Sequence, residues 1–253
     1  MDPFYFAAIG DVHGHIKQLL RHLSKRAAER PLSALLQVGD FEPHRSLEDV
    51  ALMDAPQKYR QLGEFHLLAQ GKLALPAPLY FIGGNHEPYG WLDSLAPMTL
   101  VAPDCTWIGR VGSFNLQGLR ITGVSGIEVE GLRAQRGERP AERIGVMDDE
   151  VMAALERGPA DILMIHEWPA GIHRMDGSGK RRTQGEVGSP LLRSLVDLLR
   201  PQWVICGHMH APYRATLEHE FGTTEVVCLP HVAYGPESIA LFRWQEGVIQ
   251  EVR

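Results

Sequence analysis

Short apolar runs that end in glycine or a polar residue recur along the chain and predict β-strands. They lie at residues 4–9, 34–38, 79–82, 162–165 and 203–206. Apolar positions at helical spacing predict helices at residues 16–29, 57–70, 148–157 and 190–199. This alternation of strands and helices is typical of an α/β protein with a mostly parallel sheet.

The middle of the chain has a different pattern. Short strands with glycines between them are expected at residues 106–108, 113–116 and 119–124, and they predict an antiparallel meander. Residues 126–146 lack periodicity and predict a long loop, and four more strands are expected at 213–217, 225–229, 239–244 and 248–252. We find no linker and therefore expect one domain over residues 1–253, with two facing mixed β-sheets flanked by helices.

Composition narrows the class of protein without identifying a function. The chain has 253 residues, of which 44% are hydrophobic and 22% charged, as in ordinary globular domains. A formal charge of -6 argues against a protein that coats nucleic acid non-specifically, although it leaves room for a local basic patch near a cleft. Three widely spaced cysteines, no signal peptide and no apolar run long enough to cross a bilayer predict a cytoplasmic protein.

Five predicted strands end in residues that can bind a metal ion. The candidate ligands are Asp11, His13, Asp40, Asn85, His166, His208 and His210. In α/β sheets the carboxyl ends of strands are where ligands collect. Carboxylate and amide oxygens together with imidazole nitrogens suit divalent Mn, Fe or Zn.

Each fragment alone is weak evidence for a metal site. A Gly-Asp pair after a strand is usually a turn, and a single buried histidine is usually a core residue. The Gly207-His208-Met209-His210 segment is more specific, because its two histidines reach one site only from a turn. The hypothesis rests on all five fragments occurring in order, each after an apolar strand.

These fragments resemble the five signatures of the calcineurin-like metallophosphoesterases. The signatures stand here as Asp11-Val12-His13, Gly39-Asp40, Gly84-Asn85-His86-Glu87, Ile165-His166 and Gly207-His208-Met209-His210. The resemblance implies that Asp11, His13 and His210 hold one metal ion. It implies that Asn85, His166 and His208 hold a second, with Asp40 between the two. His86 would be the catalytic histidine that protonates the leaving oxygen after attack by a hydroxide held between the metals.

Several further stretches resemble the RNA lariat debranching enzymes. Among them are Pro56-Gln57-Lys58-Tyr59, Gly123-Val124-Ser125-Gly126-Ile127 and His166-Glu167-Trp168-Pro169. Debranching enzymes carry a cysteine where this chain has Asp11, and residues 128–146 do not match their lariat-recognition loop. The resemblance therefore implies hydrolysis of a phosphodiester, with RNA or DNA as candidate substrates. The segment after Asp40 lacks the pattern of protein serine/threonine phosphatases.

Two groups of basic residues are candidates for contact with a nucleic acid. Arg133, Arg136, Arg139 and Arg143 lie in the predicted loop, where a solvated surface is the simpler interpretation. The second group follows His166, and we take His173, Arg174 and Arg181 from this region as candidate substrate-binding residues.

Two alternatives to a nucleic-acid phosphodiesterase stay open. One is a phosphomonoesterase or a phosphodiesterase of small nucleotides. The other is a non-catalytic scaffold that binds metal and a partner protein, although such scaffolds tend to lose the ligands and the histidine that this chain keeps. The sequence leaves the oligomeric state and the identity of the metals open.

Overall fold

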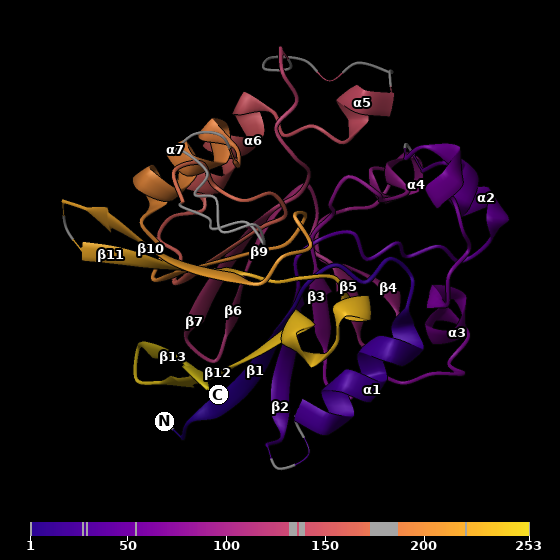
Figure 1. The fold of residues 1–253 in the computed structure, drawn as a ribbon, viewed down its shortest axis with the longest axis horizontal. Helices are drawn as coiled ribbons and strands as arrows, with labels where there is room; N and C mark the ends of the chain where they lie inside the picture. Colours follow the sequence, from indigo (N-terminus) through magenta and orange to yellow (C-terminus); the bar gives the residue numbers. More distant parts are fainter. Residues whose placement is uncertain are drawn as a thin grey trace, which may run out of the picture.

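A computed structural model of the protein describes residues 2–26, 28, 30–53, 55–131, 136, 140–172, 187–220 and 222–252. Two mixed β-sheets face each other, and helices cover their outer faces (Figure 1). This arrangement confirms the expected α/β fold with two facing sheets.

The first sheet has seven strands in the order β13-β12-β1-β2-β3-β5-β4. The bounds are β1 Phe4–Ile9, β2 Leu32–Gln37, β3 Leu79–Phe81, β4 Thr99–Ala102, β5 Cys105–Trp107, β12 Ile239–Gln245 and β13 Val248–Val252. Strands β1, β2, β3 and β5 are parallel, so their carboxyl ends share one edge of the sheet. Strands β12, β13 and β4 pair antiparallel at its two sides.

The second sheet has six strands in the order β10-β11-β9-β8-β7-β6. The bounds are β6 Val111–Leu116, β7 Leu119–Val124, β8 Ile162–Ile165, β9 Trp203–Cys206, β10 Tyr213–His219 and β11 Gly222–Cys228. Strands β7, β8, β9 and β11 are parallel, while β6 and β10 pair antiparallel at the outer positions.

The helices of the described residues are mostly short. Their bounds are α1 Ile16–Arg26, α2 Leu47–Ala51, α3 Phe65–Ala69, α4 Tyr89–Leu92, α5 Pro140–Arg143, α6 Asp148–Glu156 and α7 Pro190–Leu199. Three 3-10 turns are η1 Gln57–Tyr59, η2 Val232–Tyr234 and η3 Pro236–Ser238. Ser189 caps α7, since its Oγ accepts a hydrogen bond from Leu192 N at 2.9 Å. None of these helices has the length and apolar character that a membrane crossing would require.

Alternation along β1 shows how the layers pack. Phe6 and Ala8 belong to the core between the two sheets, whereas Ala7 and Ile9 pack with α1 on the outer face of the first sheet. A third core cluster joins the outer face of the second sheet to α6 and α7. Because both faces of each sheet are covered, the carboxyl ends of the parallel strands are where polar side chains can gather.

Two sequence predictions were wrong. The helix expected over residues 57–70 is replaced by η1 and α3, because Gly63 adopts a left-handed φ of 64° between them. A side chain at Gly63 would also lie 2.9 Å from Gly14 Cα, so two backbones approach closely here. The strand expected at 106–108 is β5 of the first sheet, whereas β6 and β7 form a hairpin in the second. Elements α2, α4, β4, η2 and η3 were not expected, nor was α5, which lies in the segment 126–146 predicted as a loop.

Candidate metal centre

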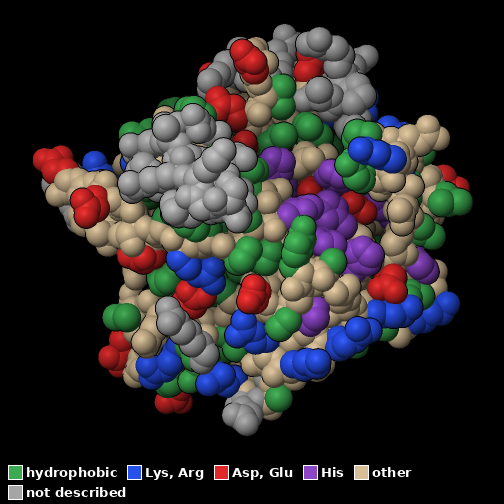
Figure 2. Space-filling view, in the orientation of Figure 1, with side chains coloured by type: hydrophobic (Ala, Val, Ile, Leu, Met, Phe, Trp, Pro, Cys, Tyr) green, Lys and Arg blue, Asp and Glu red, His purple; other side chains and the backbone are tan. Residues whose placement is uncertain are grey.

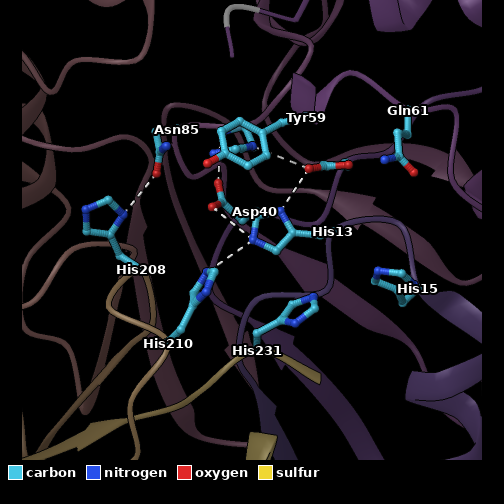
Figure 3. Close-up of a pocket in the computed structure, with 11 residues that line it drawn as sticks. His13, His15, Asp40, Tyr59, Gln61, Asn85, His208, His210 and His231 are labelled. Atoms are coloured by element: carbon cyan, nitrogen blue, oxygen red, sulfur yellow. Dashed lines mark hydrogen bonds and ion pairs between the residues drawn. The ribbon is translucent and has the colours of Figure 1, made fainter. Parts of the chain in front are cut away.

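The carboxyl ends of strands from both sheets meet around one cavity of about 360 Å³. Figure 2 shows histidine side chains gathered in a hollow of the surface there, and Figure 3 shows the residues around it. Its lining residues are His13, His15, Asp40, Glu42, Tyr59, Gln61, Asn85, His86, His208, His210 and His231. Asp11 and His166, which are fully buried, contact this lining from beneath. The structure thus brings together all seven predicted ligands and His86.

One group of candidate ligands contains Asp11, His13, Asp40 and His210. One ligand atom from each of the four lies within 4.8 Å of all the others. His210 Nε2 is 2.9 Å from Asp11 Oδ2, and His13 Nε2 is 3.2 Å from His210 Nε2. Asp40 Oδ2 lies 3.6 Å from His13 Nε2. These atoms come from the loops after β1, β2 and β9.

A second group lies on the other side of Asp40. Asn85 Oδ1 is 2.9 Å from His208 Nδ1 and 3.2 Å from His166 Nε2. His166 Nε2 is 3.5 Å from Asp40 Oδ1, so the two carboxylate oxygens of Asp40 face different groups. The other ring nitrogen of His166, Nδ1, lies 2.8 Å from the carbonyl oxygen of Val38. That contact orients Nε2 towards the centre, as is usual for metal-binding histidines.

Two contacts in the first group fit a cation better than a hydrogen bond. Asp11 Oδ2 is buried and accepts no hydrogen bond, although His210 Nε2 is only 2.9 Å away. The ring nitrogens of His13 and His210 face each other at 3.2 Å. Lone pairs that converge in this way suit a divalent ion, and the set of imidazole, carboxylate and amide atoms fits Mn, Fe or Zn.

The backbone is strained where it presents these side chains. Among the described residues ten non-glycine residues have positive φ, and five of them lie in this site. They are His13 (45°), Asp40 (51°), Glu42 (57°), His208 (65°) and His210 (49°). Left-handed conformations are unfavourable for residues with a Cβ and cluster at functional sites. The surrounding fold therefore holds these side chains in place at an energetic cost.

Glycines beside the ligands serve two different purposes. Gly39 has a φ of 98°, which confirms the sharp turn expected after its strand. Gly84 and Gly207 lack positive φ, and their role is to leave space. A Cβ on Gly84 would lie 2.3 Å from Asp40 Oδ1, and one on Gly207 would lie 2.2 Å from Asp11 Oδ1. No side chain fits at either position beside the candidate ligands.

The carboxylates control the charge of the site. Burial opposes protonation of His13, but its hydrogen bond to Glu42 and the charges of Asp40 and Glu42 raise its pKa to about 9. Burial likewise opposes protonation of His166, and Asp40 outweighs it and raises the pKa to about 10. Burial disfavours the charged form of Asp40, but His166 and His13 hold the pKa of this carboxyl well below its usual range. Protons and metal ions therefore compete for these nitrogens.

His86 lies against the first group. Its ring packs edge-on against His13 with centroids 4.9 Å apart, and its backbone N donates to Asp40 Oδ1 at 2.8 Å. Burial lowers the pKa of His86, but the nearby carboxylates of Glu42 and Asp40 outweigh it, so the pKa lies above its ordinary value. Glu42 Oε1 is 3.6 Å from His86 Nδ1. The ring lines the cavity, and its raised pKa favours the protonated form.

Glu42 and His231 also belong to the site, although neither was predicted from the sequence. Glu42 Oε1 lies 2.8 Å from His13 Nδ1, so this carboxylate orients a candidate ligand from behind. His231 packs on His13 at 4.9 Å and stacks on His210 at 5.5 Å between ring centroids. His231 follows the end of β11, which is the same sequence signal that identified the ligands after the other strands.

The basic residues predicted to contact a nucleic acid are described only in the first group. His173, Arg174 and Arg181 lie outside the described residues. In the predicted loop, Arg136 Nη2 donates to Glu150 Oε1 at 2.7 Å and to Gly145 O at 2.9 Å. Arg136 is therefore held by a carboxylate of α6 and not free for a phosphate.

Comparison with known proteins identifies the family of this chain and several relatives. A family model described as calcineurin-like phosphoesterase matches residues 4–212. The lariat debranching enzyme of Entamoeba histolytica is 30% identical over 250 residues, which cover 91% of this chain and 69% of that enzyme. The lariat debranching enzyme of Homo sapiens is 30% identical over 85% of this chain. This chain covers only 43% of the human enzyme and about half of several other relatives.

One solved structure with a similar fold has a lower sequence identity to this chain. A chain described as a novel archaeal phosphodiesterase aligns over 98% of this chain and 99% of its own length. Its sequence identity is 13% and its TM-score is 0.41.

Proposed function

Since the chain belongs to the calcineurin-like phosphoesterases, a family of metal-dependent hydrolases of phosphoester bonds, we propose that it hydrolyses a phosphodiester in nucleic acid at two divalent metal ions. Asp11, His13 and His210 would hold one ion, and Asn85, His166 and His208 the other. Asp40 would bind both. Mn, Fe and Zn are the candidate metals.

The position of Asp40 carries the proposal of two metals. Its Oδ2 faces His13 at 3.6 Å and its Oδ1 faces His166 at 3.5 Å, so one buried carboxylate separates two groups of nitrogen and oxygen atoms. A site for one ion would need only one such group. The backbone N of His86 donates to Oδ1 and fixes the carboxylate in this orientation.

Two bound ions would supply an activated water and neutralise charge on the phosphate oxygens. The protein's own residues supply the rest. His86, on the cavity wall with a raised pKa, would protonate the leaving oxygen. Glu42 contacts His13 at 2.8 Å and lies 3.6 Å from His86, so it keeps both rings in position and favours the protonated form of His86.

The relatives favour a phosphodiester of RNA as the substrate class. Their names describe lariat debranching, so cleavage of a 2'-5' branch is the first activity to test in this chain. Asp11 supplies a carboxylate at the position where the debranching enzymes carry a cysteine. Its Oδ1 accepts from His208 N at 3.1 Å, and Oδ2 lies 2.9 Å from His210. These contacts support a complete first ligand group.

A substrate series tests the proposal. The metal-free protein is reloaded separately with Mn, Fe or Zn and given bis(p-nitrophenyl) phosphate, p-nitrophenyl phosphate, linear RNA, DNA and a 2'-5' branched RNA. We expect the diester to turn over faster than the monoester. A preference for the monoester would favour a phosphomonoesterase, and no turnover with any metal would favour the scaffold alternative.

A further inference from the structure

Helix α1 carries an unusual charge pattern for this chain. Its eleven residues include four lysines or arginines and no acidic residue, whereas the whole chain has a formal charge of -6. Its apolar side buries Ile16, Leu19 and Leu23 in the core. Three cations, Lys17, Arg21 and Lys25, lie on its exposed side at intervals of four residues. They form one basic face along the helix.

The pattern does not help the helix to form. Like charges four residues apart destabilise a helix by about 0.2–0.5 kcal/mol per pair. Lys17 Nζ lies 3.1 Å from Glu64 Oε1, which offsets part of its charge. Among the described residues, neither Arg21 nor Lys25 makes an ion pair or a side-chain hydrogen bond. Within the part of the chain that the structure describes, these two cations therefore contribute no ion pair to the stability of the fold.

The basic face begins at the candidate metal centre. His13 and His15 line the cavity, and α1 starts at Ile16. In Figure 2 a row of Lys and Arg side chains lies beside the gathered histidines, at the place of α1 in Figure 1. Four helical residues rise about 6 Å, so the three cations are spaced evenly along a line that leads away from the cavity.

The helix is fixed to the backbone that carries the candidate ligands. Gln18 Nε2 donates to Val232 O at 3.1 Å, and His22 Nε2 lies 3.2 Å from the same oxygen. Val232 N in turn donates to Asp11 O at 2.9 Å. A ligand that spans α1 and the cavity would therefore bind a surface that is already in place, which lowers the cost of ordering it on binding.

We propose that Lys17, Arg21 and Lys25 bind the sugar-phosphate backbone of a nucleic acid strand whose scissile phosphate lies at the metal centre. The inference rests on the proposed function and adds the path of the substrate. Regular cations beside a phosphoesterase cavity complement a polyanion with regularly spaced charges. A substrate with only one phosphate would not extend to Arg21 or Lys25.

Salt-dependent binding tests the path. The probe is a fluorescein-labelled oligouridylate of twelve nucleotides. Its affinity for the metal-loaded protein is measured by fluorescence anisotropy from 50 to 200 mM salt. All proteins carry His86→Ala to suppress cleavage. The test variant is Arg21→Gln with Lys25→Gln. The control, Arg157→Gln with Arg243→Gln, loses the same charge from the C-cap of α6 and from β12, away from the cavity lining.

Each cation that contacts a single strand contributes about 0.7 to the slope of log K against log salt. The test variant should therefore lower the slope by about 1.4 and weaken binding by roughly 25-fold at 0.1 M salt. Its melting temperature should be unchanged or slightly higher, because like-charge repulsion is removed. The control should keep the slope.

An unchanged slope in the test variant, or an equal loss in the control, would overturn the path along α1. A protein that binds acidic polypeptide but not the oligouridylate would overturn it too. Failure of the proposed function has a different signature, since the wild-type chain would then not hydrolyse bis(p-nitrophenyl) phosphate, a substrate too short to touch α1.

Discussion

Replacing Gly84 by alanine tests whether free space beside Asp40 is what permits metal binding. The new Cβ would lie 2.3 Å from Asp40 Oδ1 and 2.6 Å from His166 Nε2. Ordinary contact begins at 3.4 Å, so Asp40 Oδ1 must move by at least 1.1 Å. The backbone at Gly84 does not have positive φ, and alanine adds no conformational strain of its own.

The magnitude follows from this displacement. Shifts of about 1 Å in a catalytic site can lower rates by about 100-fold. Forcing a methyl group into a packed region costs about 1–3 kcal/mol of unfolding free energy. We therefore expect Gly84→Ala to lose bound metal, to fall at least 100-fold in kcat for bis(p-nitrophenyl) phosphate, and to melt several degrees lower.

The matched control is Gly90→Ala. Gly90 lies in α4, and a Cβ there would meet the side chain of Leu52 at 3.1 Å. Leu52 is 39% exposed and free to move, so this variant should keep metal, activity and stability. Metal content is measured by mass spectrometry of the dialysed protein, and stability by thermal melting. Two metal ions per chain and turnover within threefold of wild type in Gly84→Ala would refute the reasoning.

Three other predictions concern the charged residues of the site. His86→Ala should keep its metals and lose most turnover, and full activity in that variant would exclude His86 as the proton donor. Asp40→Ala should lose both metals in the same metal analysis, and normal metal content would remove Asp40 from its bridging position. The pKa values of His13 and His166 are raised to about 9 and 10, so their protonated forms stabilise the metal-free fold below pH 6.5. This stability is lost as the pH rises through those values. The melting temperature of the protein in EDTA should therefore fall from pH 6.5 to 9.5. The Mn-loaded protein should become more stable relative to the protein in EDTA, because metal no longer competes with protons. A melting temperature in EDTA that rises over this range would contradict the raised pKa values.

The candidate ligands could be predicted because each follows a buried strand. A fully apolar run such as 162–165 leaves little choice but a central strand, and the first polar residue after it, His166, must lie at the edge of the sheet. Parallel pairing of β8 with β9 then brings His166 near His208. The local sequence pattern was sufficient here because the candidate ligands directly follow the apolar strands.

Other features depended on contacts between distant segments. The apolar spacing of 57–70 favours a helix, but the close approach of Gly63 to Gly14 overrides it. In the sequence, Glu42 looks like an ordinary loop residue. In the structure its backbone N donates to Glu87 Oε2 at 2.9 Å, and its side chain points towards His13. The basic face of α1 was not predicted, because only the fold shows that its cations are exposed beside the cavity.

The strained backbone of the site has a consequence for how this chain can change over time. His13, Asp40, His208 and His210 each hold a conformation that costs on the order of 1 kcal/mol and that glycine would adopt freely. Glycine at any of these positions would favour the fold and abolish a ligand. Selection for stability and selection for activity therefore oppose each other at these four residues. Related proteins that no longer need the activity should lose these four side chains first.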